Sequence, residues 1–258
     1  MSGVEFAFLL IGLGIVATLY ASVGHGGASG YLAIMSLTSY GLMEAAWLKQ
    51  HAWFLNLLVA SLAFYHYRKA GFHNSKLTIP FIIASIPMAF LGGYLIIDGV
   101  IYDFLLSITL VWAAWRLFNS KSIDDEINTT IPSIPQALPW GAGIGLASGL
   151  IGVGGGIFLS PIVLLKKWAA PKTIAATSAI FIWVNSISGL MGATASGQLV
   201  LDLEILTAFA TVVIVGGFIG SAYGAKFAPQ SAIRKLLVLV LLIAAAKRIF
   251  GLSFLLIG

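Results

Sequence analysis

The sequence predicts an all-α integral membrane protein of two inverted repeats, each a glycine-broken re-entrant helical hairpin followed by three transmembrane helices. Composition gives the first reason. Of 258 residues, 59% are hydrophobic and only 9% are charged, and the mean hydropathy is +1.01, whereas a soluble domain carries about 25% charged residues. The second reason is that two glycine clusters interrupt long apolar runs, one in each half of the chain. The third is that the two halves resemble each other.

The first half, residues 1–118, contains one glycine cluster and three long apolar runs. The cluster is Gly24, His25, Gly26 and Gly27, between apolar residues 4–22 and 28–38. Glycine in a helix interior costs roughly 1 kcal/mol relative to alanine, so the cluster predicts a helix break. The later runs are long enough to cross a bilayer and predict spans at 43–67, 77–97 and 102–118.

The second half, residues 137–258, repeats this order. Its cluster is Gly152, Val153, Gly154, Gly155 and Gly156, within the apolar stretch 138–165, and three spans are expected at 173–195, 203–225 and 236–257. The polar residues 119–136 predict a cytoplasmic linker between the halves. Gly24 matches Gly152 and Asn56 matches Asn185 at separations of 128 and 129 residues. Internal repeats of this kind are typical of secondary transporters.

The positions of Lys and Arg distinguish two topologies. If both broken segments crossed the membrane, the 14 basic residues would divide evenly between the two sides. If each broken segment instead returns to the side it entered, one side holds eleven and the other three. The positive-inside rule favours the second topology, with both chain ends outside. Helix arms of about 10–12 residues would rise roughly 15–18 Å, so that the two tips meet near the midplane of a ~30 Å core.

The second glycine cluster also carries a resemblance to a known family. The stretch GLIGVGGGIFLSPIVLL, followed by Ala175-Ala176-Thr177-Ser178 and by Asn185, resembles the bacterial TauE/SafE sulfite exporters. The resemblance implies a permease of the inner membrane that exports sulfite, sulfoacetate or a related small sulfur anion. The first half departs from this pattern, because it has His25 in its break and Trp47-Leu48-Lys49-Gln50-His51 where the second half has Thr177 and Ser178.

Physical reasoning independently favours an anion. A helix is expected to start after each break, near Ala28 and Ile157, and helix N-termini present free N–H groups and partial positive charge. Lys49 lies seven residues before Asn56 and therefore on the same helix face. The candidate substrate-binding residues are Gly24, His25, Gly26, Gly27, Ser29, Lys49, Gln50, His51, Asn56, Gly152, Gly154, Gly155, Gly156, Thr177, Ser178 and Asn185.

Simpler interpretations stay open at this point. The glycines can serve close helix packing, which is the favoured interpretation for Gly92, Gly93, Gly216 and Gly217. Lys49 can extend to the outer interface or pair with Glu44, and each histidine can be a packing residue. Because the first half adds His25 and Lys49, we expect it to determine substrate choice.

Features missing from the sequence narrow the class of function. No Asp or Glu lies in the middle of an expected span, although cation carriers usually need buried carboxylates. No motif indicates an enzyme, a cofactor, a metal site or nucleic-acid binding. The main expectation is a secondary transporter that holds a small sulfur-containing anion at two opposed helix N-termini. The alternatives are a passive anion channel and, less favoured, a metal or cation permease; a homo-oligomer is left open.

Overall fold

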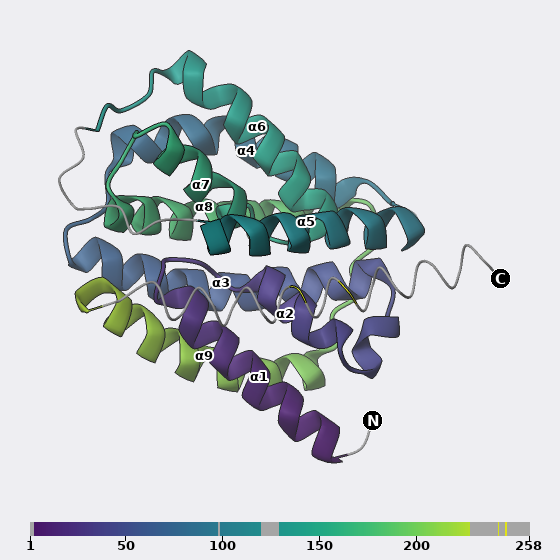
Figure 1. Ribbon diagram of the computed structural model, residues 1–258. Coiled ribbons are helices and arrows are strands. Elements are labelled where there is room, and N and C mark those ends of the chain that lie inside the picture. Colours follow the sequence, from purple (N-terminus) through teal and green to yellow (C-terminus); the bar gives the residue numbers. More distant parts are fainter. Residues whose placement is uncertain (1–2, 98, 120–128, 228–241, 243–245, 247–258) are drawn as a thin grey trace.

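The described part of the chain is entirely helical (Figure 1). The computed structural model describes residues 3–97, 99–119, 129–227, 242 and 246. These residues form no strand and contain a short 3-10 helix, η1 (Ser39–Leu42), together with α1 (Gly3–Ala21), α2 (Ala28–Ser36), α3 (Ala45–Lys69), α4 (Ser75–Tyr94), α5 (Gly99–Asn119), α6 (Ile134–Ile151), α7 (Gly156–Leu165), α8 (Pro171–Ala195) and α9 (Leu203–Lys226). The all-α class is confirmed. The span expected at 236–257 and linker residues 120–128 lie outside the described residues.

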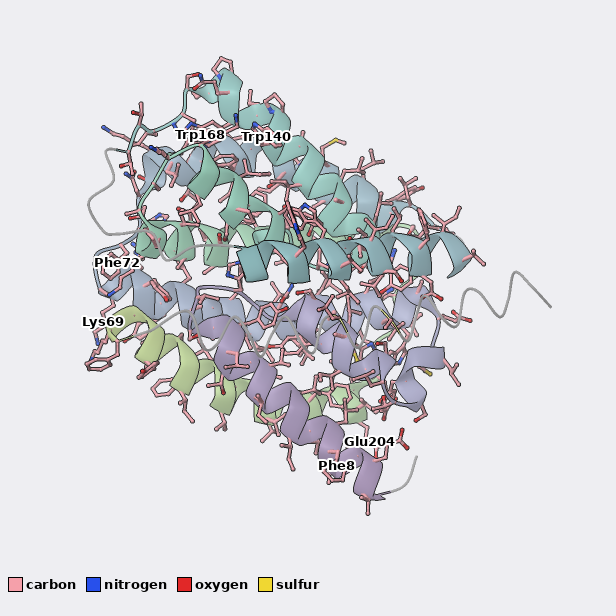
Figure 2. All side chains as sticks on the ribbon, in the orientation of Figure 1. Phe8, Lys69, Phe72, Trp140, Trp168 and Glu204 are labelled. Atoms are coloured by element: carbon pink, nitrogen blue, oxygen red, sulfur yellow. The ribbon has the colours of Figure 1, made fainter. Side chains whose placement is uncertain are left out.

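The chain is a multi-pass membrane protein. Four described helices, α1, α4, α8 and α9, are long and apolar enough to cross a bilayer. Large apolar side chains also cover outward faces, as Phe8, 70% exposed, does on α1 (Figure 2). In contrast, α3 has 25 residues but carries Lys49, Gln50, His51 and Asn56, all buried. The part of this helix from Lys49 to Asn56 therefore lies in the protein interior.

The helices pack as two bundles that meet along α3 and α8. We call α1, α2, α3 and α9 the α3 bundle, and α4, α6, α7 and α8 the α8 bundle; α1 and α3 contact α9, and α6 and α8 contact α4. Each bundle therefore takes one helix, α9 or α4, from the other half of the sequence. The two bundles are not the same bodies as the sequence halves.

Glycines allow the closest helix approaches within the bundles. A Cβ at Gly145 of α6 would stand 2.5 Å from the Ser85 carbonyl oxygen of α4, and one at Gly92 would stand 2.6 Å from the Leu146 carbonyl oxygen. A Cβ at Gly216 of α9 would collide with the Gly14 carbonyl oxygen of α1. Small residues at helix interfaces are the usual means of packing in membranes. The packing interpretation of these scattered glycines agrees with these contacts.

Both expected helix breaks are present. One separates α1 from α2 and the other separates α6 from α7. In Figure 1, α2 leads back toward the end of the molecule near the N-terminus, whereas α7 leads to the opposite end. The returning arms α2 and α7 have 9 and 10 residues, close to the expected length. The inverted relation of the two complete repeats stays a prediction.

The entering arms are longer than the sequence analysis expects. Helices α1 and α6 have 19 and 18 residues instead of 10–12, so that expectation is wrong for them. At 1.5 Å per residue, such a helix is about 27–28 Å long. Both run obliquely to α3 and α8 in Figure 1, and an oblique helix advances less through the bilayer than its own length.

Charged groups mark the two ends of the molecule. Figure 2 shows Lys69 and Phe72 at one end and Glu204 at the opposite end. We call these the Lys69 end and the Glu204 end. The sequence analysis assigns the Lys69 end to the cytoplasm, and this orientation stays a prediction.

Candidate functional site

The second glycine segment has a backbone that other residues rarely adopt. Gly152, Gly154 and Gly155 have φ angles of 93°, 76° and 85°, in the left-handed region that favours glycine. Gly152 ends α6 by donating its N–H to the Ser148 carbonyl oxygen at 2.9 Å. Gly155 precedes α7 as an N-cap without a side-chain hydrogen bond. The first turn of α7 therefore presents amide groups that no cap side chain occupies.

The first glycine segment is closed by protein contacts. Gly27 is the N-cap of α2, with φ 102°. The first amide of this helix, at Ala28, donates to the Asn56 Oδ1 atom of α3 at 2.9 Å. The Tyr31 hydroxyl donates to the Gly26 carbonyl oxygen at 2.8 Å, and the hydroxyls of Tyr20 and Ser29 are hydrogen-bonded at 2.9 Å. The candidate Ser29 is therefore already paired.

Asn56 brings the two segments together. A Cβ at either Gly26 or Gly154 would collide with its carboxamide, so both backbones pass directly against this side chain. Its Nδ2 atom also donates to Ser186 of α8 at 3.3 Å. Asn56 is completely buried. The two broken segments therefore meet in the interior, where the α3 and α8 bundles join.

His25 connects the first segment to the second half. Its Nδ1 atom donates to the Val23 carbonyl oxygen at 2.9 Å, so Nε2 accepts from the Ser160 hydroxyl at 3.2 Å. Ser160 in turn accepts from Ser178 at 2.8 Å. A Cβ at Gly156 would lie 3.4 Å from the His25 ring. The candidates His25, Gly156 and Ser178 are thus brought together, with Ser160 between two of them.

Lys49 lies against the second segment rather than the first. A Cβ at Gly152 would be 2.6 Å from the Lys49 Cβ atom. The side chain is 2% exposed, and its Nζ atom lies 5.7 Å from the centre of the Trp53 ring. In the opposite direction, Gly24 of the first half packs on Ala175 of α8. Each glycine segment is therefore supported by the central helix of the other bundle.

Three other candidates lie away from the glycine segments. Gln50 donates to the Gln198 carbonyl oxygen at 2.6 Å and accepts from the Val200 amide at 2.7 Å. His51 donates to the Trp47 carbonyl oxygen and accepts from the Asp202 amide. Both hold the connection between α8 and α9, and the structure does not bring them to the glycine segments; their assignment to the site stays a prediction. Thr177 accepts from Thr78 of α4 at 3.2 Å and thereby joins two helices of the α8 bundle.

Asn185 is the repeat counterpart of Asn56, but its environment differs. It is completely buried, and its Nδ2 atom lies 3.2 Å from the position that a Cβ at Gly155 would take. Neither its Oδ1 nor its Nδ2 atom has a hydrogen-bond partner in the protein. The Trp53 Nε1 and Ser148 Oγ atoms share this condition.

Four further residues lie beside the candidate residues and were not predicted from the sequence. These are Trp53, Ser148, Ser160 and Ser186. Two of them had an available signal, since Trp53 follows Lys49 by one helical turn and Ser148 precedes Gly152 by one turn.

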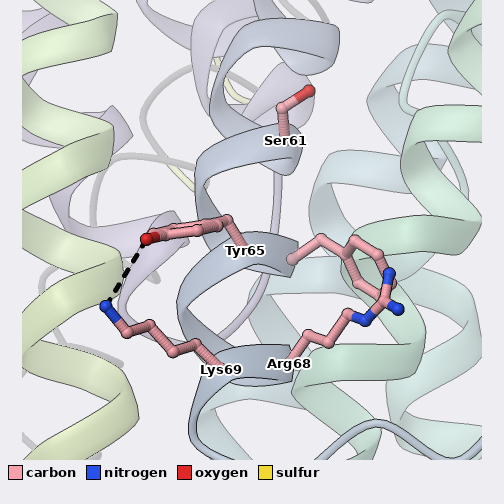
Figure 3. A pocket seen from close by; sticks show the side chains of 5 residues that line it. Ser61, Tyr65, Arg68 and Lys69 are labelled. Atoms are coloured by element: carbon pink, nitrogen blue, oxygen red, sulfur yellow. Dashed lines mark hydrogen bonds between the residues drawn. The ribbon is translucent and has the colours of Figure 1, made fainter.

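One cavity lies away from the glycine segments. It has a volume of about 430 Å³, lies at the Lys69 end of α3, and is lined by Ser61, Phe64, Tyr65, Arg68 and Lys69 (Figure 3). In Figure 3 the Lys69 ammonium reaches the Tyr65 hydroxyl, 3.5 Å away. None of the candidate residues lines this cavity.

The charges of the described residues set a limit on the chemistry. The acidic residues lie at helix starts: Glu5 and Glu204 in first turns, Glu44 and Asp202 at N-caps, and Asp103 four residues after α5 begins. Within this part of the chain, no cluster of three or more His, Asp or Glu side chains could hold a metal ion. The interior of the described helices therefore offers hydrogen-bond donors and one ammonium group in preference to carboxylates.

Broken helices that meet inside a multi-pass helical protein define a membrane transporter. Comparison with known proteins identifies which one. The chain belongs to the sulfite exporter TauE/SafE family, whose model matches residues 7–248. The family resemblance noted from the second glycine cluster is thereby confirmed, and the class is a transporter rather than an enzyme.

Two curated relatives carry the same class of name. The chain is 34% identical over 242 residues to the probable membrane transporter protein y4hK of Sinorhizobium fredii, covering 93% of this chain and 96% of the relative. It is 28% identical over 141 residues to the probable membrane transporter protein MJ0441 of Methanocaldococcus jannaschii, covering 54% and 52% of the two chains. No solved structure shows significant similarity to the chain.

Proposed function

We propose that this transporter exports a small sulfur oxyanion or organosulfonate, such as sulfite or sulfoacetate, across the inner membrane. The family membership supports a sulfur-containing anion. The observation that carries the proposal is the meeting of the two glycine segments at Asn56, in a completely buried position. Broken helices are tolerated at membrane depth only where protein or a water-filled cavity satisfies the freed backbone groups, and in transporters such breaks form the substrate site.

Helix starts at these breaks suit an anion. Both α2 and α7 begin at a glycine N-cap in the left-handed conformation. Helix N-termini carry partial positive charge and exposed N–H groups. The buried Lys49 adds a full positive charge beside Gly152. A metal or cation would instead need buried carboxylates, and the described Asp and Glu residues lie at helix starts.

The two bundles supply a means of alternating access. They meet along α3 and α8, and the glycine segments lie at that junction. In our proposal, rocking of the α3 bundle against the α8 bundle exposes the anion first to one side and then to the other. This is the usual relation between repeats and transport in such proteins. Because each bundle includes one helix of the other half, the moving bodies are the bundles rather than the sequence halves.

Transport in reconstituted vesicles tests this function. Vesicles that contain the full-length protein are expected to take up sulfite or sulfoacetate with saturation, and to show counterflow when preloaded with unlabelled anion. Protein-free vesicles and vesicles given acetate serve as controls. Uptake that rises linearly with concentration and shows no counterflow would assign a passive channel instead. No uptake of any sulfur anion above the protein-free level would overturn the proposed substrate class.

A further inference from the structure

Three buried polar side chains without protein partners lie on helices that pack around the second glycine segment. They are Trp53 of α3, Ser148 of α6 and Asn185 of α8, each completely buried. More than nine in ten buried polar groups in proteins are hydrogen-bonded, and leaving one unpaired costs about 1–3 kcal/mol. Three such groups therefore require an explanation.

Close packing against glycines locates these side chains in the interior. A Cβ at Gly155 would lie 3.2 Å from the Asn185 Nδ2 atom and 2.9 Å from Ile144, which precedes Ser148 by one helical turn. A Cβ at Gly189, one turn after Asn185, would lie 2.8 Å from Cε2 of Trp53, the carbon bonded to Nε1. Asn185 therefore lies at the N-cap of α7, Ser148 lies one turn before Gly152 on α6, and the Trp53 indole lies beside Gly189 on α8.

Two of these groups, Asn185 and Ser148, have equivalents in the first half that are paired within the protein. Asn56, the counterpart of Asn185, bonds to the Ala28 amide and to Ser186. Tyr20, which lies 128 residues before Ser148, is paired with Ser29. The two helix N-termini are therefore unequal. The polar side chains near the start of α2 are hydrogen-bonded within the protein, whereas their equivalents near the start of α7 are not.

We propose that the transported oxyanion binds at the N-terminus of α7 alone, with the Asn185 carboxamide, the Ser148 hydroxyl and the Trp53 indole N–H as its side-chain donors. This assignment rests on the proposed function and makes its site asymmetric. Lys49 belongs to the same site, because its Nζ atom lies 5.7 Å from the Trp53 ring and its backbone packs on Gly152. Asn56 then has a structural role, holding α2 and α8 around the anion.

The geometry also defines the class of ligand. In this assignment the donors come from α3, α6 and α8 as well as from the start of α7. A pyramidal or tetrahedral sulfur oxyanion places its oxygens in three directions and matches this arrangement, whereas a planar carboxylate offers two oxygens on one side. A cation has no matching carboxylate among the described residues near α7. The site therefore selects sulfite, thiosulfate or a sulfonate over acetate.

Binding of sodium sulfite to the purified full-length protein in nanodiscs tests the assignment. The informative variants are Asn185→Leu and Ser148→Ala, which remove unpaired polar atoms with little change of volume, and Trp53→Phe, which removes the indole N–H together with part of the buried ring. We expect at least tenfold weaker sulfite binding for Asn185→Leu and severalfold weaker binding for the other two. The midpoint of thermal unfolding without sulfite should stay equal or rise for Asn185→Leu and Ser148→Ala, because an unpaired buried group has been removed, and should fall for Trp53→Phe, because the smaller ring leaves a cavity.

Ser188→Ala is the matched control for Ser148→Ala. Ser188 lies on α8, is 5% exposed, and already donates to the Val184 carbonyl oxygen at 2.7 Å. Its loss should leave sulfite binding within about twofold of the original. In contrast to Asn185→Leu, Asn56→Leu should lower the unfolding midpoint, because the Ala28 amide loses its hydrogen-bond partner.

The outcomes separate this inference from the proposed function. Wild-type binding that is lost in Asn185→Leu, with its unfolding midpoint preserved, supports the α7 site. Wild-type binding that Asn185→Leu and Trp53→Phe both retain overturns the α7 assignment and leaves the transporter function standing. A wild-type protein that binds and transports none of sulfite, thiosulfate and sulfoacetate overturns the function and this site together. A fall of the Asn185→Leu midpoint with unchanged sulfite affinity in the folded protein gives Asn185 a structural role only.

Discussion

At the level of single residues, three glycines determine the backbone conformation of the second helix break. Gly152, Gly154 and Gly155 all have positive φ angles, and a Cβ at Gly154 would collide with Asn56 while standing 2.9 Å from Ile182. The segment therefore combines a backbone that other residues avoid with contacts that leave no room for a side chain. Neither condition applies to Gly143, an exposed glycine of α6 with nothing within 4 Å of its Cβ position.

Gly154 and Gly143 give a matched pair of substitutions. Gly154→Ala should lower the free energy of unfolding by at least about 2 kcal/mol, through left-handed strain and through the clash with Asn56. Gly143→Ala should leave stability unchanged or raise it by up to about 1 kcal/mol, because alanine favours helix. Thermal unfolding in one detergent measures both. Equal midpoints for the two variants would contradict the described backbone of the break.

Lys49 supplies a second prediction at this level. Its charge is buried without an ion pair in the described structure, so Lys49→Met should leave the unfolding midpoint unchanged or raise it. Sulfite affinity should fall at least tenfold, or by about 1.4 kcal/mol, if the ammonium acts on the anion. Titration of sulfite into the variant checks this, with Lys76→Met, an exposed lysine at the start of α4, as control. Unchanged affinity in Lys49→Met would favour the packing interpretation of this residue.

The sequence could predict some site residues and not others for a geometric reason. Repeat spacing identifies Asn56 and Asn185, and glycine clustering identifies both breaks. Gln50 and His51 follow Lys49 directly, and successive helical residues point about 100° apart, so they reach the α8–α9 connection instead. Ser160 and Ser186 find their hydrogen-bond partners in the other half of the chain, across more than 100 residues. No local pattern in the sequence contains that information.

At the level of helices, the start of a helix depends on its N-cap side chain, and an N-cap residue can be recognised in the sequence. Asp202 is the N-cap of α9 and accepts from the Glu204 and Ile205 amides at 3.1 and 3.2 Å. The Asp202 amide in turn donates to His51 of α3. The lengths of α1 and α6 could not be predicted in this way. They depend on how obliquely each helix packs, because the tilt sets how far it advances through the bilayer. The sequence therefore predicts where a helix starts better than it predicts the length and tilt of that helix.

Removing the α9 cap tests this point. Asp202→Ala should lower the free energy of unfolding by roughly 1 kcal/mol, since two amides in the first turn lose their acceptor. Asp202→Asn should retain most of the stability, because asparagine caps a helix nearly as well. The unfolding midpoints of the two variants, measured side by side, provide the check. If both variants lose the same amount, the negative charge rather than the cap hydrogen bonds stabilises α9.

At the level of the whole molecule, the exchange of α4 and α9 between the halves was not visible in the sequence. The repeat indicated two similar units, but α4 packs on α6 and α8, and α9 packs on α1 and α3. The exchange makes the α3–α8 contact the junction between the two bundles. A repeat pattern records which elements correspond and does not record which elements touch.

The orientation of the whole molecule in the membrane can also be tested. The positive-inside rule places the Lys69 end in the cytoplasm, and the chain contains no native cysteine that would react in the background. Ser75 at the start of α4 and Ser133 before α6 are exposed near the Lys69 end, whereas Ser39 in η1 and Leu199 before α9 are exposed near the Glu204 end. In intact cells, a membrane-impermeant maleimide should label the Ser39→Cys and Leu199→Cys variants and spare the Ser75→Cys and Ser133→Cys variants.

The labelling pattern also tests the return of each broken segment. Ser39 follows α2 and Ser133 precedes α6, so each reports the side on which one hairpin opens. If α1 and α2 together crossed the membrane, Ser39 would lie on the opposite side from the start of α1, and Glu5 could not bond to the Ser39 amide, as it does at 3.0 Å. The predicted topology has the two hairpins opening to opposite faces, so that the proposed anion site at the start of α7 would be approached from both. Labelling of all four cysteines from outside would contradict this arrangement, since no single orientation of the described helices exposes both ends.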